Sequence, residues 1–149
     1  MISVFGSNFG QEETFAASQT LQSQWVGMGK KVKEFEEAFA KHLAVEDSVL
    51  VDSGSNALFL AIKLLELPPH SEIILPSFTW IACAQAILMA GHQPVFCDVE
   101  PYSQNVTAET IIPHITAKTK AIMVVHYGGK PVDMNPILAL GFPVIEDAA

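Results

Sequence analysis

The sequence predicts an α/β fold, with a mainly parallel sheet flanked by helices. Short and almost purely apolar runs alternate with helical patterns from residue 48 to the end of the chain. This alternation is typical of parallel strands that are buried on both faces. The chain has 149 residues, of which 50% are hydrophobic and 16% are charged. Such a chain is long enough to form one compact domain with a core.

The elements follow from local patterns. Two helices, 11–24 and 30–43, are predicted before the sheet, and Phe35 and Phe39 share one face of the second. The predicted strands are residues 48–52, 72–77, 93–101, 120–129 and 143–147. The predicted helices between them are residues 56–67, 78–91, 107–116 and 133–140. Gly91 closes one of these helices, and Thr107 is the expected N-cap of another.

Charge and composition exclude several classes of function. The formal net charge of -8 argues against nucleic acid and against anionic membrane surfaces as partners. All the basic residues are Lys, so no bidentate Arg clamp can form within this chain. No apolar run approaches a membrane span, and residues 1–13 lack the features of a signal peptide, so we expect a cytoplasmic protein. Cys83 and Cys97 have no metal-ligand spacing and are interpreted as small core residues.

Polar residues gather where the predicted strands end, which is the edge at which such sheets bind ligands. At the first such loop, 52–56, the backbone N–H groups of Gly54, Ser55 and Asn56 would be free donors at the start of a helix. They suit a phosphate group. The alternative is a plain N-cap by Ser53 or Ser55.

Two further loops carry candidate residues. Trp80 follows the strand at 72–77 and could stack on a flat ring, or could begin the apolar face of the next helix, as could Phe78. Asp147 ends the last buried strand, where a carboxylate is costly unless it is paired. It could cap a following helix, or it could pair with a metal, an Arg or a protonated ring nitrogen. Pyridoxal phosphate (PLP) would use all three features, although a flavin or a nucleotide would share the first two.

Five segments in order resemble the DegT/StrS-type sugar aminotransferases, a family of PLP-dependent enzymes of fold type I. The segments are residues 25–43 (WVGMGKKVKEFEEAFAKHL), 53–62 (SGSNALFLAI), 72–101 (EIILPSFTW through CDVEP), 115–134 (ITAKTKAIMVVHYGGKPVDM) and 144–149 (VIEDAA). The resemblance runs through nearly the whole chain. It implies that residues 1–149 are the N-terminal part of a PLP-binding large domain like that of aspartate aminotransferase.

The resemblance also implies roles for individual residues. Gly54 and Ser55 would bind the PLP phosphate, Trp80 would stack on the pyridine ring, and Asp147 would pair with the pyridinium nitrogen. For His126 and Glu146 we expect structural roles. No metal site is expected.

The family's Schiff-base lysine is expected beyond Ala149, so no catalytic residue is assigned within this chain. The family's C-terminal small domain is also absent from these residues. We therefore expect the chain to be inactive on its own.

The activity implied by the resemblance is transfer of an amino group, from a donor such as glutamate, to a keto group on a nucleotide-linked sugar. Such enzymes supply cell-surface polysaccharide or amino-sugar biosynthesis and act as homodimers with a shared active site. One alternative is a PLP-dependent nucleotide-sugar dehydratase of the same fold, in which a His replaces the Schiff-base lysine. Another is a non-catalytic, truncated relative with a binding or regulatory role.

Overall fold

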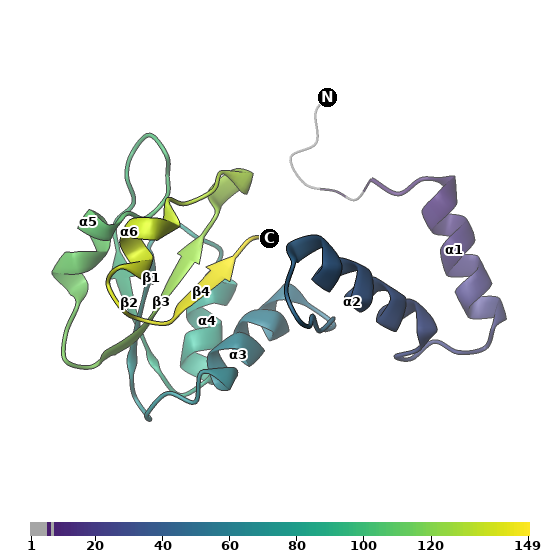
Figure 1. Ribbon diagram of the computed structural model, residues 1–149, viewed down its shortest axis with the longest axis horizontal. Helices are drawn as coiled ribbons and strands as arrows, with labels where there is room; N and C mark the ends of the chain where they lie inside the picture. Colours follow the sequence, from purple (N-terminus) through teal and green to yellow (C-terminus); the bar gives the residue numbers. More distant parts are fainter. Residues whose placement is uncertain (1–5, 7) are drawn as a thin grey trace. The chain divides into compact units, whose positions relative to one another are not determined.

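The computed structural model describes residue 6 and residues 8–149. The chain divides into two compact units, Met1–Leu50 and Val51–Ala149 (Figure 1). Within the described part of the chain, no helix has the length and apolar character needed to cross a membrane.

The first unit contains the two predicted helices, α1 (Gln11–Gln22) and α2 (Lys30–Leu43). Phe35 and Phe39 stack on each other along α2, with ring centroids 5.6 Å apart. The helix ends at Ala44, which adopts a left-handed conformation with φ 55°. Both helix predictions are confirmed.

The predicted strand at Ser48–Asp52 is wrong: this segment has no strand conformation and is hydrogen-bonded to α2 instead. Glu36 accepts a hydrogen bond of 2.7 Å on its backbone oxygen from the Ser48 hydroxyl. Its carboxylate accepts another of 2.8 Å from the backbone N–H of Leu50. No described strand pairs with this segment. An apolar run without a neighbouring strand to pair with does not form a ladder.

The second unit is built on a parallel sheet of β1 (Glu72–Pro76), β2 (Gln93–Cys97), β3 (Thr119–Val125) and β4 (Val144–Asp147). The strands lie in the order β2-β1-β3-β4. β1 and β3 are central, and nearly all their residues are buried. The mainly parallel sheet predicted from the sequence is confirmed.

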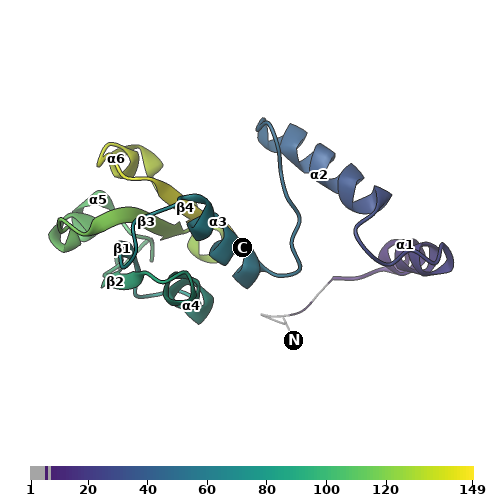
Figure 2. The ribbon, with the colours of Figure 1, turned by 90° about the horizontal axis from the view of Figure 1, so that it is seen from below.

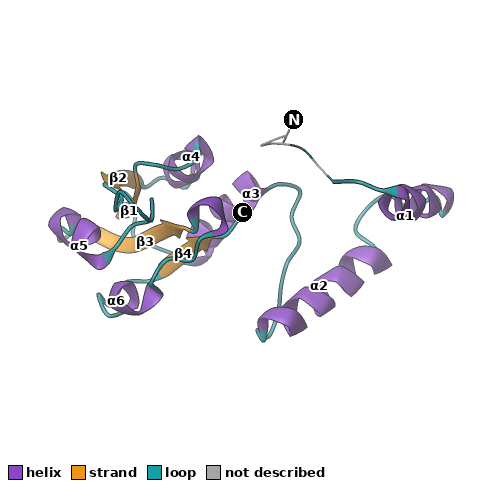
Figure 3. Ribbon diagram, turned by 90° about the horizontal axis from the view of Figure 1, so that it is seen from above, coloured by secondary structure: helices purple, strands orange, loops and turns teal. Residues whose placement is uncertain are grey.

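Helices cover both faces of this sheet (Figures 2 and 3). On one face lie α3 (Gly54–Leu64) and α4 (Ile81–Met89), which cover a cluster that includes Ile73, Leu75 and Met123. On the other lie α5 (Ala108–Ile111) and α6 (Met134–Leu138), which cover a cluster that includes Ile74 and Ile122. Successive residues of β1 and β3 thus pack on opposite faces of the sheet, as strand geometry requires.

Two predicted helix ends are confirmed. The Thr107 hydroxyl accepts from the Thr110 N–H, while the Thr110 hydroxyl accepts from the Thr107 N–H, forming a capping box. Gly91 follows α4 with φ 88°. The helix after Thr107 is shorter than predicted and continues as a 3₁₀ turn over Ile112–His114, because Pro113 lacks an N–H for the helical ladder.

His92 lies in the turn before β2 and is buried, with 8% of its surface exposed. Its Nδ1 atom has no hydrogen-bond partner. Burial lowers the pKa of His92, and the nearby charges of Lys63 and His70 lower it further. The folded protein therefore binds a proton at His92 less readily than the unfolded chain does.

We expect the protein to become less stable as the pH falls, because of His92. Its folded-state pKa lies below the unfolded value of about 6.5, so the unfolded chain takes up the proton more readily. The free energy of unfolding should decline as the pH drops below that unfolded value. In His92→Leu and His92→Asn this decline should be shallower, as measured by urea unfolding between neutral and acidic pH.

The two variants also separate the effect of removing a titrating group from the effect of removing a buried polar atom. At neutral pH, His92→Leu should equal or exceed the wild type in stability, since it removes a buried polar atom that lacks a partner. His92→Asn should not give this gain. A decline as steep in both variants as in the wild type would show that His92 is not the titrating group.

Candidate functional site

The carboxyl ends of the four parallel strands lie at one edge of the sheet, and the predicted ligand-binding loops follow them. The start of α3 also lies towards this edge. A short connection, residues 65–71, leads from the end of α3 to the first residue of β1, so the helix runs against the strand. The topology therefore brings the α3 N-terminus, the loop before α4 and the end of β4 to the same side of the sheet.

The start of α3 has both features that the sequence suggested for the glycine turn, a side-chain N-cap and free backbone N–H donors. Ser53 is the N-cap, and its hydroxyl accepts a hydrogen bond of 3.3 Å from the Asn56 N–H. The prediction that the Asn56 N–H is free is therefore wrong. In the described part of the chain, the N–H groups of Gly54 and Ser55 have no hydrogen-bond partner, and a Cβ placed on Gly54 would meet nothing within 4 Å. Two donors and open space remain at this helix end.

Trp80 is 73% exposed at the start of α4, so it does not contribute to the apolar face of that helix. Phe78 also lies outside the core and packs against Tyr127, with ring centroids 4.5 Å apart. This pair joins the loop after β1 to the loop after β3. The indole of Trp80 is left free to contact a ligand at the sheet edge.

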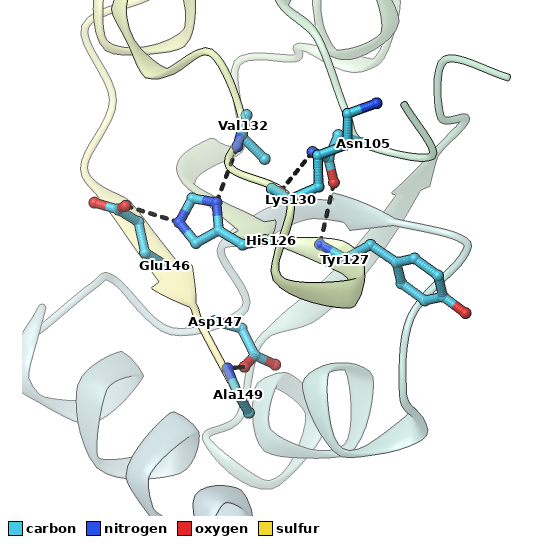
Figure 4. A network of polar contacts seen from close by, with 8 residues as sticks. All are labelled: Asn105, His126, Tyr127, Lys130, Val132, Glu146, Asp147 and Ala149. Atoms are coloured by element: carbon cyan, nitrogen blue, oxygen red, sulfur yellow. Dashed lines mark hydrogen bonds and ion pairs between the residues drawn. The ribbon is translucent and has the colours of Figure 1, made fainter. Parts of the chain in front are cut away.

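Asp147 is half-buried at the end of β4. Its Oδ2 atom accepts a hydrogen bond of 3.2 Å from the Cys83 thiol on α4. Its Oδ1 atom accepts one of 3.2 Å from the Ala149 N–H (Figure 4). Burial raises the pKa of Cys83 to about 11, and Asp147 contributes to the increase, so the thiol stays protonated at neutral pH.

The sequence predicted that Cys83 and Cys97 are buried free thiols, and this is confirmed. It did not predict that Cys83 contacts Asp147. The only signal was helical spacing, which places Cys83 on the α4 turn that follows Trp80. No hydrogen bond joins Gly54 or Ser55 to Asp147 within the described residues, so these candidates share an edge of the sheet and not a direct contact.

His126 follows β3 and bonds to the segment before α6 and to strand β4, as expected for a structural histidine (Figure 4). Its Nδ1 atom accepts a hydrogen bond of 3.0 Å from the Val132 N–H. Its Nε2 atom lies 3.0 Å from the Glu146 carboxylate. Because Nδ1 is an acceptor, a neutral His126 carries its proton on Nε2 and donates it to Glu146.

Asn105 is a site residue that the sequence analysis missed. It is buried, and its side chain donates to the Lys130 backbone oxygen at 2.9 Å and accepts from the Tyr127 N–H at 3.1 Å (Figure 4). It therefore fixes the glycine-containing turn Tyr127–Gly129 after β3. A polar residue in a loop carries no sequence signal for burial.

The candidate residues at this edge are of types that could bind an organic ligand. In the described part of the chain, no group of three His, Cys, Asp or Glu residues is placed to hold a metal ion. Helix N–H donors suit a phosphate, an exposed indole suits a flat ring, and a half-buried carboxylate suits a cationic nitrogen.

Comparison with known proteins gives one consistent family. The profile of the DegT/DnrJ/EryC1/StrS aminotransferase family matches residues 8–149. The dTDP-4-dehydro-2,3,6-trideoxy-D-glucose 4-aminotransferase of Saccharopolyspora spinosa is 39% identical over 155 aligned positions. That alignment covers 100% of this chain and 40% of the relative, so the chain spans less than half of the relative's length.

Comparison with solved structures gives the same result. The aminotransferase TlmJ from Streptoalloteichus hindustanus has a TM-score of 0.92 and 41% identity, covering 100% of this chain and 42% of that one. A GDP-4-keto-6-deoxymannose-3-dehydratase with a trapped PLP-glutamate geminal diamine has a TM-score of 0.89 and 28% identity. There the match covers 97% of this chain and 40% of that one.

We expect His126→Phe to destabilise the folded protein by roughly 1–3 kcal/mol, because it leaves the N–H of buried Val132 without an acceptor. Glu146→Gln should cost less than about 1 kcal/mol, because the Glu146 side chain is 53% exposed and the amide can still accept from His126. Chemical denaturation of both variants checks this order. Equal losses would mean that the charge of Glu146 beside His126, and not the bond to Val132, carries the stabilisation.

Proposed function

This chain belongs to the DegT/DnrJ/EryC1/StrS aminotransferase family, and we propose that the full-length protein is a PLP-dependent aminotransferase of a nucleotide-linked keto-sugar. The observation that carries this proposal is the placement of Asp147 at the carboxyl edge of the sheet. It is half-buried, and only a thiol and a backbone N–H are hydrogen-bonded to its carboxylate in the described part of the chain.

The residues of this edge fit PLP. The N–H groups of Gly54 and Ser55 would bind its phosphate at the α3 N-terminus, with the Ser55 hydroxyl as a further donor. The Trp80 indole would cover one face of the pyridine ring. Asp147 would hold a proton on the ring nitrogen. When bound, PLP supplies an electron sink for reaction at the amino carbon, and a protonated ring nitrogen strengthens that property.

The proposed donor is glutamate, and the proposed acceptor is a sugar with a keto group. The absence of Arg from this chain fits an uncharged sugar ring and excludes an Arg clamp on the donor carboxylate within these residues, so a group from elsewhere would bind that carboxylate. The lysine that holds the cofactor covalently and the C-terminal small domain would likewise lie beyond Ala149. Residues 1–149 would then be the N-terminal part of the PLP-binding large domain.

The proposed assembly is a homodimer with a shared active site, in the cytoplasm. Exposed apolar residues on α4, namely Ile81, Leu88 and Met89, support a protein contact on that helix. Two free cysteines without a disulfide fit a reducing compartment. The proposed product would supply cell-surface polysaccharide or amino-sugar biosynthesis.

A second candidate is a nucleotide-sugar dehydratase of the same fold, which the similarity to the GDP-4-keto-6-deoxymannose-3-dehydratase favours. The residues described here would bind PLP in the same way in both enzymes. The two differ at one downstream position, which carries a lysine in the aminotransferase and a histidine in the dehydratase. Products distinguish them directly: an amino sugar in one case and a deoxygenated keto-sugar in the other.

The full-length protein should bind PLP, and the bound PLP should quench the protein's Trp fluorescence. Asp147→Ala should weaken PLP binding by about tenfold or more, the scale of one hydrogen bond between charged groups. Trp80→Ala should weaken binding and reduce the quenching. Transamination from glutamate should fall with both.

Glu146→Gln is the matched control, since Glu146 is the adjacent carboxylate and bonds to His126 instead. It should bind PLP as the wild type does. If Asp147→Ala and Glu146→Gln behaved alike, Asp147 would not be the partner of the ring nitrogen. A wild-type protein that bound no PLP would exclude the proposed function.

A further inference from the structure

Thr79, Cys83 and Asp147 form a continuous line of polar contacts at the carboxyl edge. The Thr79 hydroxyl lies 3.2 Å from the Cys83 sulfur. The same sulfur lies 3.2 Å from Oδ2 of Asp147. The three residues come from the loop before α4, from α4 itself and from the end of β4. They join α4 to β4 through Cys83 and Asp147, which are 64 residues apart in the sequence.

The direction of these hydrogen bonds follows from the number of protons. An ionised carboxylate can only accept, so the Cys83 thiol must donate its one proton to Asp147. The sulfur then has only lone pairs to offer to Thr79. The Thr79 hydroxyl is therefore the donor in its contact with Cys83. The line runs in one direction, from Thr79 through Cys83 to Asp147.

The surroundings of Cys83 keep this arrangement fixed. Cys83 is fully buried and belongs to the cluster that α3 and α4 form with the sheet. Its raised pKa, about 11, keeps the thiol protonated over the physiological pH range. Cys97 is the other buried cysteine, but its sulfur contacts the backbone oxygen of Leu75 at 3.4 Å. Only Cys83 touches a carboxylate.

We propose that Thr79 and Cys83 are positioning residues for Asp147, which orient its carboxylate and tie it to the loop that presents Trp80. The inference rests on the proposed function, because it assigns these contacts to the cofactor's ring. Thr79 immediately precedes Trp80. One line of bonds therefore sets the position of the carboxylate relative to the indole that would cover the ring.

A purely packing role for Cys83 makes a different prediction. If the side chain only filled the core, Cys83→Ala would lower stability through a small cavity, and Cys83→Ser would be no better. A positioning residue needs a donor at that place. Cys83→Ser restores a hydroxyl donor, so it should recover cofactor binding even though it is less apolar.

The first test measures the contact itself, without a cofactor. The infrared S–H stretching band of Cys83 can be identified in the full-length protein as the band lost in Cys83→Ala. It should move to higher frequency in Asp147→Ala and Asp147→Asn, because the strong acceptor is lost. It should not move in Glu146→Ala. An unmoved band in both Asp147 variants would overturn the proposal.

The second test measures PLP binding. Cys83→Ala and Thr79→Val should each weaken PLP affinity by severalfold, and Cys83→Ala by up to about tenfold, the scale of a hydrogen bond to a charged group. The absorption maximum of bound PLP should shift with them. Cys83→Ser should return affinity to within about twofold of wild type, and Cys97→Ala is the matched control that should change neither property.

The outcomes separate the two proposals. If the wild type binds PLP and Cys83→Ala binds it equally well with the same spectrum, the positioning role is wrong while the proposed function stands. If the wild type binds no PLP, the proposed function fails, and the infrared band alone decides whether Cys83 orients Asp147.

Discussion

The parallel pairing of β4 with β3 is the constraint on which the candidate site depends. Asp147 lies opposite Val125, Glu146 lies opposite Val124, and the His126 N–H donates to the Asp147 backbone oxygen at 2.9 Å. Side chains alternate along a strand, so this register sends the two adjacent acids to opposite faces. Asp147 reaches Cys83 on the α4 side, while Glu146 bonds to His126. A shift of one residue would turn Asp147 away from Cys83 and place the Glu146 side chain on the α4 side instead.

Buried neutral side chains fix the loop that follows β3. The polar residues after β3 are held by buried groups: Asn105 fixes the turn at Tyr127, and His126 bonds to the Val132 N–H. Each uses a neutral acceptor to satisfy a backbone donor, which avoids burying a charge without a partner. The charged side chain of this network, that of Glu146, is exposed to solvent. The loops are thus fixed by their backbone, while Asp147 keeps accepting capacity for a ligand.

The sequence predicted what depends on periodicity and local chemistry. Strands β1 to β4, the Thr107 cap and the left-handed Gly91 are of this kind, because an apolar run, a hydroxyl before a helix and a glycine after one each have a local physical cause. The predicted strand at 48–52 failed because pairing depends on residues elsewhere in the chain: no described strand pairs with this segment, and Glu36 bonds to the Ser48 hydroxyl and the Leu50 N–H. The Cys83 contact and the burial of Asn105 were missed for the same reason. Both depend on residues distant in sequence that periodicity does not bring together.

A thiol beside a carboxylate has a particular consequence. A thiol is a weaker donor than a hydroxyl, so it orients Asp147 while neutralising little of its charge. The two groups also do not exchange a proton, because burial and the carboxylate itself raise the pKa of Cys83 to about 11. The negative charge therefore stays on Asp147, which is where a cationic ring nitrogen would need it.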